Sequence, residues 1–399
     1  MQTSTFEIPV GPQHPALKEP ENFTFIVDGE QIVKVKARIG YNHRGIEKAA
    51  ESRSYIQNIY LIERICGICN VAHTTCYCQN VEYLYEEAIP RRAEFIRVIV
   101  TELNRIHSHL LWLGVAGHEI GFDTFFMYVW RDRERVMDMI EMVTGNRVNT
   151  AINTIGGVRR DITSEIIERM KRSLEILKDR TEYYKKVAMS ERTVTARTEG
   201  IGILKPDEAV KLCAVGPTLR ASGIKSDTRR NDPHLVYDEI PFNVVTYDSC
   251  DVLARILVRI DEVLESIDII QYCLEHMPSG PIRIRLPRAP PVGESVSLTE
   301  APRGELIHYV KSNGTERPER YKVRSPTLGN IPAVCEMLTS KGDYIVNIAD
   351  IPIVLASIDP CFSCTDRSIR FTDPFKGREW VWSYEQLKKH TGKSSDGFR

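Results

Sequence analysis

The feature that most constrains this chain is a pair of Cys-x-x-Cys motifs, Cys66 with Cys69 near the start and Cys361 with Cys364 near the end. This spacing lets a turn or a helix start direct two sulfur atoms to one point, so the motifs together offer four thiolates to zinc, iron or nickel. Zinc ribbons place their two pairs within roughly 15–20 residues of each other. Here most of the chain lies between the pairs. The sequence therefore predicts a metal at the centre of the fold and disfavours a local structural zinc site.

The composition predicts a globular protein with reduced cysteines. Its 399 residues are 42% hydrophobic and 27% charged, which suits a sizeable core, and a net charge of -1 gives no sign of a nucleic-acid partner. We find no apolar run of about 18 residues that would cross a membrane. Residues 1–7 lack the basic and apolar regions of a signal peptide. Ten cysteines then favour metal binding over disulfides, and the six outside the motifs are expected to be buried.

Hydrophobic periodicity predicts an α+β fold, mainly α, in which a central bundle of long helices has small antiparallel sheets near both ends of the sequence. We expect strands over 6–36, a small sheet from 305–311 and 344–348, and helices over 51–87 (interrupted by the first motif), 91–114, 123–143, 162–189, 248–276 and 327–339. The Pro-rich residues 278–291 are the expected boundary. The predicted regions are a β region with a Pro-rich loop (1–48), the helical bundle (49–277), an α+β region (278–367) and a C-terminal extension (368–399).

The residues around the two motifs resemble those of a known enzyme family. Arg-x-Cys-Gly-x-Cys-x-x-x-His at 64–73 and Asp-Pro-Cys-x-x-Cys-Thr-Asp-Arg at 359–367 are similar to the motifs of [NiFe] hydrogenase large subunits. Arg367, where many relatives have His, and the short chain resemble the energy-converting, membrane-associated (group 4) branch, which is homologous to the 49-kDa subunit of respiratory complex I. The resemblance extends to Arg367. It implies the fold that these subunits share and, as the activity, the reversible reduction of protons to H2.

The resemblance also implies a cofactor, a nickel–iron centre with CO and CN ligands on the iron. Its protein ligands would be the cysteines of both motifs: Cys66, Cys69, Cys361 and Cys364. By resemblance, the second cysteine of each motif would bridge nickel and iron, and the first would bind nickel alone.

Four further side chains receive roles from the resemblance. Glu19, in the Pro-rich loop, would exchange protons with the centre. His73 would donate a hydrogen bond to a bridging thiolate and so lower the electron density on its sulfur. Arg303 would lie over the metals and offer a fixed positive charge. Glu47 would hold magnesium or a similar ion, unless the neighbouring Arg44 neutralises its carboxylate.

Several partners are implied in the same way. The chain has no iron–sulfur spacing of the ferredoxin type, so its electrons would come through a separate small iron–sulfur subunit, from ferredoxin or formate. Membrane subunits of a complex I-like assembly would couple the reaction to ion translocation and hold the chain at the cytoplasmic side of the membrane. A maturation endopeptidase would cut after Arg367 and remove residues 368–399.

Two other classes of protein stay open. One is a complex I-like subunit of a quinone reductase without a nickel–iron centre, whose members have lost the cysteines. The other is a scaffold protein with a structural zinc. Metal analysis separates the three hypotheses, because they predict nickel with iron, no metal, and zinc.

Overall fold

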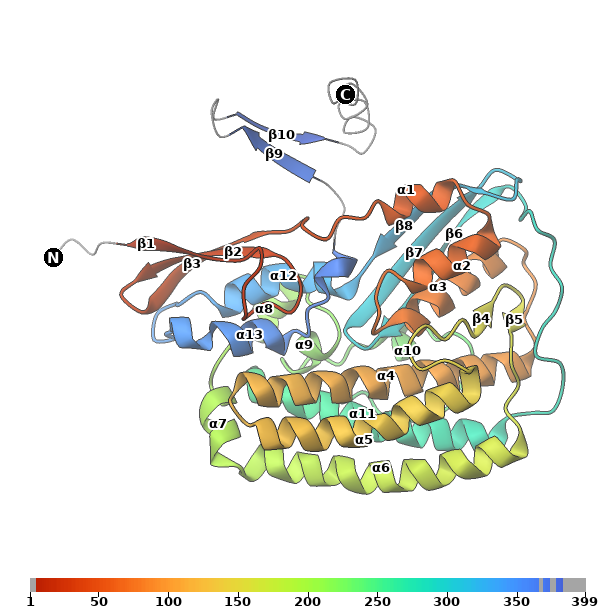
Figure 1. The fold of residues 1–399 in the computed structure, drawn as a ribbon, viewed down its shortest axis with the longest axis horizontal. Coiled ribbons are helices and arrows are strands. Elements are labelled where there is room, and N and C mark those ends of the chain that lie inside the picture. Colours follow the sequence, from red (N-terminus) through yellow and green to blue (C-terminus); the bar gives the residue numbers. More distant parts are fainter. Residues whose placement is uncertain (1–4, 366–368, 374–377, 383–399) are drawn as a thin grey trace, which may run out of the picture.

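Four long helices form one side of the molecule (Figure 1). The computed structural model describes residues 5–365, 369–373 and 378–382. The long helices are α4 (Arg91–Glu119), α5 (Asp123–Thr144), α6 (Ser164–Ser190) and α11 (Val252–His276). Each packs against two of the others, and α4 lies nearest the rest of the molecule whereas α6 lies farthest from it. The predicted bundle is therefore present, and its helices begin and end close to the expected residues.

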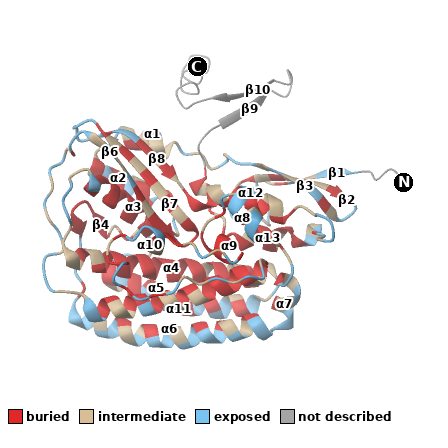
Figure 2. Cartoon of the chain, turned by 180° about the vertical axis from the view of Figure 1, so that it is seen from behind, coloured by how far each residue is buried: buried red, intermediate tan, exposed pale blue. Residues whose placement is uncertain are grey.

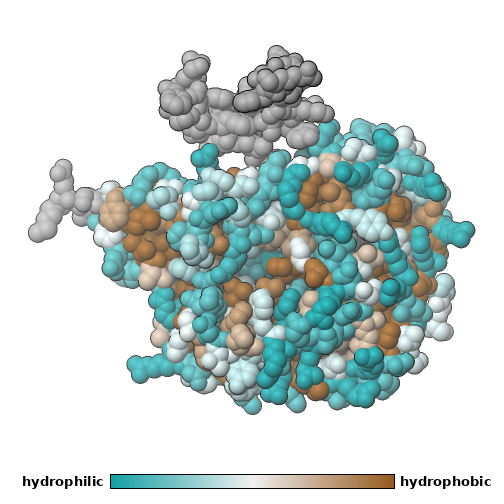
Figure 3. Space-filling model, viewed as in Figure 1, coloured by the Kyte–Doolittle hydropathy of each residue, from teal (hydrophilic) through white to brown (hydrophobic). Residues whose placement is uncertain are grey.

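Apolar patterning explains which helix lies inside. On α6 the buried residues recur every three or four positions, from Met170 and Leu174 to Leu177, Thr181 and Tyr184, as on a helix with one face in the core. Buried residues occur on all sides of α4 instead. Figure 2 shows this difference as a largely buried α4 and an exposed outer side of α6. Most of the surface over the long helices is hydrophilic, whereas apolar side chains gather around the N-terminal sheet (Figure 3).

Short helices connect and cover the bundle. Before it come α1 (Ile46–Glu51), α2 (Tyr55–Glu63) and α3 (Asn70–Tyr83). Between α6 and α11 come α7 (Arg192–Thr198), α8 (Pro206–Lys211), α9 (Pro217–Arg220) and α10 (Thr228–Asn231). Near the end come α12 (Pro326–Met337), η1 (Ile348–Asp350), α13 (Ile351–Ser357) and η2 (Phe362–Cys364).

Two three-stranded antiparallel sheets lie near the ends of the sequence, as predicted. The first has the order β1-β2-β3, with β1 (Phe6–Val10), β2 (Asn22–Asp28) and β3 (Gln31–Arg38). The second has the order β6-β7-β8, with β6 (Gly293–Ala301), β7 (Gly304–Ser312) and β8 (Pro318–Arg324). Two short strands, β4 (Asn153–Thr154) and β5 (Gly157–Val158), pair beside α3.

One predicted pairing is wrong. Residues 305–311 lie in β7, but they pair with β6 and β8, and 344–348 form no strand with them. A tight turn at 302–303 folds β7 back on β6, and β8 pairs with the other edge of β7. Both edges of β7 are therefore paired with the strands that precede and follow it in sequence. Tyr344 and Asn347 make only isolated bridges, to Lys341 and Gln31.

A cluster of buried charges joins the middle of the bundle to the end of β6. This ion-pair cluster comprises Glu102, Arg105, Arg220, Asp227, Arg229, Glu262 and Glu300. Glu102 contacts Arg229 at 3.1 Å, and Arg229 contacts Asp227 at 2.7 Å. Arg220 bridges Glu262 at 2.7 Å and Glu300 at 2.8 Å. Segments far apart in sequence are thus tied together by paired charges.

These observations confirm the predicted fold class. None of the helices in the described part of the chain is long and apolar enough to cross a bilayer. Residues 278–291 link α11 to β6 without regular structure, and the proposed division into regions stays a prediction. Within 368–399 the structure describes a hairpin of β9 (Ile369–Asp373) and β10 (Arg378–Trp382). The expected cleavage point after Arg367 lies outside the described residues.

Candidate metal centre

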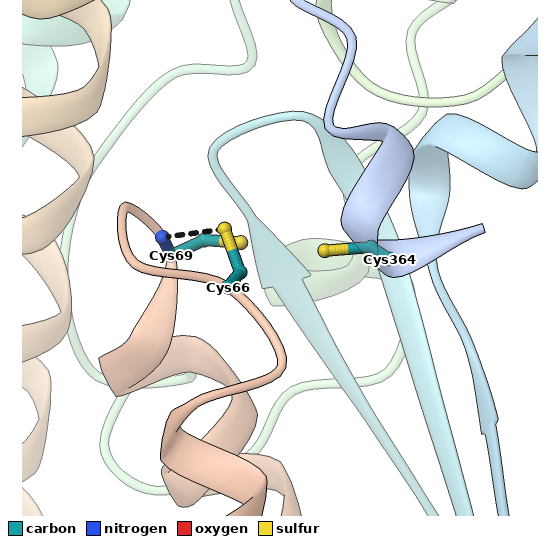
Figure 4. A group of neighbouring side chains, drawn as sticks. All are labelled: Cys66, Cys69 and Cys364. Atoms are coloured by element: carbon teal, nitrogen blue, oxygen red, sulfur yellow. Dashed lines mark hydrogen bonds between the residues drawn. The ribbon is translucent and has the colours of Figure 1, made fainter. Parts of the chain in front are cut away.

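The fold brings the two Cys-x-x-Cys motifs together. Cys66 lies in the turn between α2 and α3, and Cys69 is the residue at which α3 begins. Cys361 directly precedes the short helix η2, and Cys364 is the last residue of that helix. Figure 4 shows the sulfur of Cys364 directed from η2 towards those of Cys66 and Cys69. The helix-start geometry expected from the spacing is therefore present at both motifs.

The four sulfur atoms form one compact group. The sulfurs of Cys66, Cys69 and Cys364 all lie within 4.8 Å of one another. Cys361 Sγ lies 3.4 Å from Cys66 Sγ and 2.8 Å from Cys364 Sγ. All four cysteines are buried and free of disulfides. Two thiolates on one ion lie at most about 4.6 Å apart, twice a metal–sulfur bond, so this spacing suits a shared soft metal site.

Of the four cysteines, Cys66 is the one that most readily loses its proton to become a thiolate. Hydrogen bonds, first from Cys361 and then from Cys364 and Cys69, hold the pKa of Cys66 well below its ordinary value. Backbone N–H groups of Ile68 and Cys69 also donate to its sulfur, at 3.4 and 3.2 Å. Interaction with Cys361 and the other cysteines, together with burial, raises the pKa of Cys364 well above its ordinary value. The metal-free group therefore concentrates negative charge on Cys66.

Arg44 fastens the two cysteine loops together. Its guanidinium donates to the carbonyl oxygens of Arg64 (2.9 Å) and Ile65 (2.8 Å) in the first loop and of Ser363 (2.9 Å) in the second. The guanidinium thereby bridges the two loops, and neutralisation of Glu47 by Arg44 stays a prediction.

A mostly apolar pocket of about 340 Å³ adjoins the cysteines. Cys66, Cys361, Arg303 and Asp359 line it, and so does Gly67, where an added Cβ would meet nothing within 4 Å. The pocket thus offers room beside the sulfurs and two polar groups facing the same space.

Arg303 is held by the fold from two directions. It occupies the turn between β6 and β7, where Gly216 packs so closely that an added Cβ would lie 2.4 Å from the Arg303 carbonyl oxygen. Its side chain donates to the backbone oxygen of Asp359 at 2.6 Å and to its carboxylate at 2.9 Å. Asp359 has a φ of 52°, an uncommon conformation for a residue other than glycine. Such strain often accompanies functional positions.

Glu19 lines the same pocket as Arg303, next to the second cysteine loop. Its carboxylate accepts a hydrogen bond from the Ser363 backbone N–H at 3.0 Å and another from the Ser363 hydroxyl at 2.6 Å. Ser363 stands between the two cysteines of the second motif. The carboxylate is therefore tied directly to the loop that carries Cys361, whose thiol it also influences electrostatically.

His73 lies next to the second motif. On the first turns of α3 its Nε2 faces Cys364 Sγ at 3.9 Å. Burial, the largest cause, lowers the pKa of His73 to about 4, so the ring is neutral near pH 7. A neutral imidazole has one N–H donor, and this geometry suits the predicted hydrogen bond to a thiolate.

Glu47 has other partners than the predicted ion. One carboxylate oxygen accepts from Lys322 Nζ at 2.7 Å and the other from the Val323 backbone N–H at 3.0 Å. These contacts join α1 to β8. They leave the proposed magnesium site without support from the described residues, and it stays a prediction.

The donor set fits a nickel–iron centre. Four buried thiols can become thiolates on a soft metal, and the adjoining pocket has space for further ligands. Two buried atoms beside it, Arg303 Nη1 and Asp359 Oδ2, have no hydrogen-bond partner within the described chain. Buried polar atoms rarely stay unsatisfied, so a bound group that contacts them is favoured.

Several residues of the site were not foreseen. They are Arg44, Ser363, His308 and Tyr321. The first three contact partners more than two hundred residues away in sequence, and Tyr321 reaches the site through His308. Asp359 and Ser363 lie within the quoted second motif and Arg44 was named beside Glu47, so these residues carried a local signal, whereas His308 and Tyr321 carried none.

Of the six other cysteines, three are buried as expected, namely Cys76, Cys78 and Cys273. The other three depart from the expectation: Cys213, in the turn after α8, is exposed, and Cys250 and Cys335 are half-buried.

Two family profiles match the chain. The first, described as "Respiratory-chain NADH dehydrogenase, 49 Kd subunit", matches residues 119–290 and 287–367. The second, described as "Nickel-dependent hydrogenase", matches residues 44–114, which include Cys66 and Cys69.

Individual relatives are of more than one kind. The chain is 42% identical to the "Membrane-bound hydrogenase subunit alpha" of Pyrococcus furiosus over 90% of this chain and 87% of that protein. It is 41% identical to the "Carbon monoxide-induced hydrogenase" of Rhodospirillum rubrum, over 91% and 100%. An NADH-quinone oxidoreductase subunit of Dehalococcoides mccartyi is 36% identical, over 92% and 100%.

A solved structure has the same fold. It is the membrane-bound sulfane sulfur reductase (MBS), an archaeal respiratory membrane complex, in which one chain superposes with a TM-score of 0.86 and 32% identity. The match covers 92% of this chain and all of that one.

Proposed function

This chain belongs to the family that joins membrane-bound hydrogenases to the 49-kDa subunits of respiratory-chain NADH dehydrogenases, and we propose that it is the catalytic large subunit of an energy-converting [NiFe] hydrogenase. The observation that carries this proposal is the convergence of four buried, free cysteine sulfurs beside an apolar pocket. When bound, a nickel–iron centre supplies the redox metals at which two protons and two electrons combine to form H2.

The residues of the chain divide the remaining work. The four cysteines bind the metals, and Arg44 keeps their two loops in register. Arg303, fixed by Asp359, presents a permanent positive charge at the pocket without taking part in proton exchange. Glu19 accepts or returns the proton at the second cysteine loop, to which Ser363 holds it. The apolar lining excludes water and leaves the pocket open to a small neutral gas.

The partners follow from the same family. Electrons reach the site through a small iron–sulfur subunit, supplied by ferredoxin or by formate oxidation, and membrane subunits couple turnover to ion translocation. The chain then lies at the cytoplasmic side of the membrane. An endopeptidase removes residues 368–399 after the metals are inserted. The intact mass of active enzyme tests the last point, because a chain that ends at Arg399 and carries full nickel would contradict processing.

A second function has support in the relatives. A quinone-reductase subunit without nickel is favoured by the profile of the 49-kDa subunit and by an apolar pocket large enough for a ring. The four cysteines have no task in that function. Exchange of H2 with D2O, which needs no electron partner, distinguishes the two. Rapid exchange supports the hydrogenase, whereas quinone reduction without exchange by a nickel-free chain would support the alternative.

A further inference from the structure

A line of three buried side chains leads away from the cysteines. His73 Nε2 lies 3.9 Å from Cys364 Sγ, and the other ring nitrogen of His73, Nδ1, lies 3.2 Å from His308 Nε2. His308 Nδ1 in turn lies 3.0 Å from the hydroxyl of Tyr321. We call these residues the histidine relay. They come from α3, β7 and β8, and all three have 0% exposure.

Packing fixes the rings of the relay. Tyr321 meets His308 edge to face, with ring planes at 84°, and meets Tyr77 in the same way at 87°. The side chain of Asn80 donates to the backbone oxygen of His308 at 2.5 Å, which ties α3 to β7. Because the rings are packed on all sides, they cannot rotate towards other hydrogen-bond partners. Which ring nitrogen carries the proton therefore decides which hydrogen bonds form.

Neutral histidines can satisfy this line in two directions. In one, the Tyr321 hydroxyl donates to His308 Nδ1, His308 Nε2–H donates to His73 Nδ1, and His73 Nε2–H donates to Cys364. In the other, every donor is reversed and the line begins with a protonated Cys364 thiol. A thiolate can only accept a hydrogen bond, and a cysteine bound to a metal is a thiolate. A metal-bound Cys364 therefore receives a hydrogen bond from His73 only in the direction that begins at Tyr321.

We propose that His308 and Tyr321 are positioning residues that hold His73 in its Nε2–H form, so that it donates to the Cys364 thiolate and sets the electron density of the metal centre. This inference rests on the proposed function. Partners of this kind fix the tautomer of a histidine at a metal site, and hydrogen bonds to sulfur tune the metal. Cys66 differs, because backbone N–H groups that no side chain controls donate to its sulfur.

The test compares Tyr321→Phe with the original chain. Phenylalanine keeps the ring packing and removes only the hydroxyl that donates to His308. Nitrogen-15 NMR of the loaded enzyme should show both histidines with the proton on Nε2, and the variant should show mixed tautomers. Infrared spectra should show the CO and CN bands of the iron at lower frequency, because a thiolate without its donor gives more electron density to the metals.

Other variants separate positioning from packing. Tyr309→Phe, on the outer face of the same sheet, removes a hydroxyl that donates to Glu294 and should leave the histidine signals and infrared bands unchanged. His308→Leu should shift the bands further and lower H2 turnover about 10- to 100-fold. His308→Gln offers an amide N–H in place of the ring donor and should recover part of both effects.

Two results would overturn the inference. One is a nickel-loaded Tyr321→Phe enzyme whose tautomers and infrared bands match those of the original chain. The other is His308→Leu with unchanged bands. Failure of the proposed function is a distinct result, since the chain would then contain no nickel and iron, and the inference would fail with it.

Discussion

The cysteine site and the ion-pair cluster are both removed from solvent and rich in ionisable groups, yet they satisfy those groups differently. In the cluster, Glu102 accepts hydrogen bonds from Arg105, Arg229, Ser266 and Tyr237. At the cysteine site, sulfur atoms face one another, and Arg303 and Asp359 each leave a buried polar atom without a partner in the described chain. Paired charges suit a structural role, whereas polar atoms left without a partner beside a pocket suit a site that binds something else.

The pKa values show the same contrast. Burial alone would raise the pKa of Glu102, but the charges of Arg105 and Arg229 and two hydrogen bonds lower it to about 2. Burial likewise opposes ionisation of Glu262, and Arg220 and His109 outweigh it, so that its pKa is also about 2. The carboxylates of Glu102 and Glu262 are thus stabilised as ions by the fold, whereas three cysteines keep their protons until a metal replaces them.

The largest effect should follow from Cys361→Ser. A neutral hydroxyl cannot replace a thiolate on a soft metal, so nickel and all H2 turnover should be lost. Thermal unfolding of the metal-free chain should change little on this substitution, because the ion-pair cluster is untouched. Cys213→Ser, at an exposed cysteine, is the matched control and should keep the metals. Full nickel content in Cys361→Ser would show that the site does not depend on this ligand.

Glu19→Gln should keep the metals and slow turnover by about 10²–10⁴-fold. The amide can preserve the hydrogen bonds to Ser363 but has no acidic proton to exchange. Rates of H2 evolution and H2/D2O exchange measure the effect, with Glu7→Gln on β1 as the control. Equal rates for Glu19→Gln and the original chain would place the proton route elsewhere.

Arg229→Met should act on the other region. It leaves Glu102 and Asp227 short of a buried cation, and losing one partner of a buried ion pair costs about 3–5 kcal/mol. Denaturant unfolding of the metal-free chain measures this loss. Lys178→Met breaks the exposed pair with Asp268 instead and should cost about 0–1 kcal/mol. Similar losses for both variants would contradict the structural role of the cluster.

Acid should weaken the cluster selectively. Glu102 and Glu262 have folded pKa values of about 2, below the ordinary value of 4.5, so the unfolded chain binds more protons in this range. The stability that they contribute is complete above about pH 4.5 and is lost as the pH falls towards 2. Unfolding midpoints of the metal-free chain between pH 6 and pH 3 measure it. A flat profile would mean that these carboxylates are not stabilised by folding.

Local patterns predicted much of this molecule. Helical spacing located α4, α5, α6 and α11, and the cysteine motifs located the cysteine site, because both signals lie within short segments. Partners chosen by tertiary packing could not be predicted. The local sequence offers Arg44 only Glu47 as a partner, because the Ser363 carbonyl that it contacts lies more than three hundred residues away. His308 likewise has the pattern of an ordinary strand residue, and its partner His73 follows only from the packing of β7 on α3.

The central claim is that the cysteine site holds nickel and iron. Elemental analysis of the purified complex by mass spectrometry tests it most directly, in the original chain and in Cys361→Ser. We expect nickel and iron in equal amounts at this subunit, after the iron of the partner clusters is subtracted, and no nickel in the variant. Zinc in place of nickel, or a chain free of metal that is still active with its partners, would contradict the account.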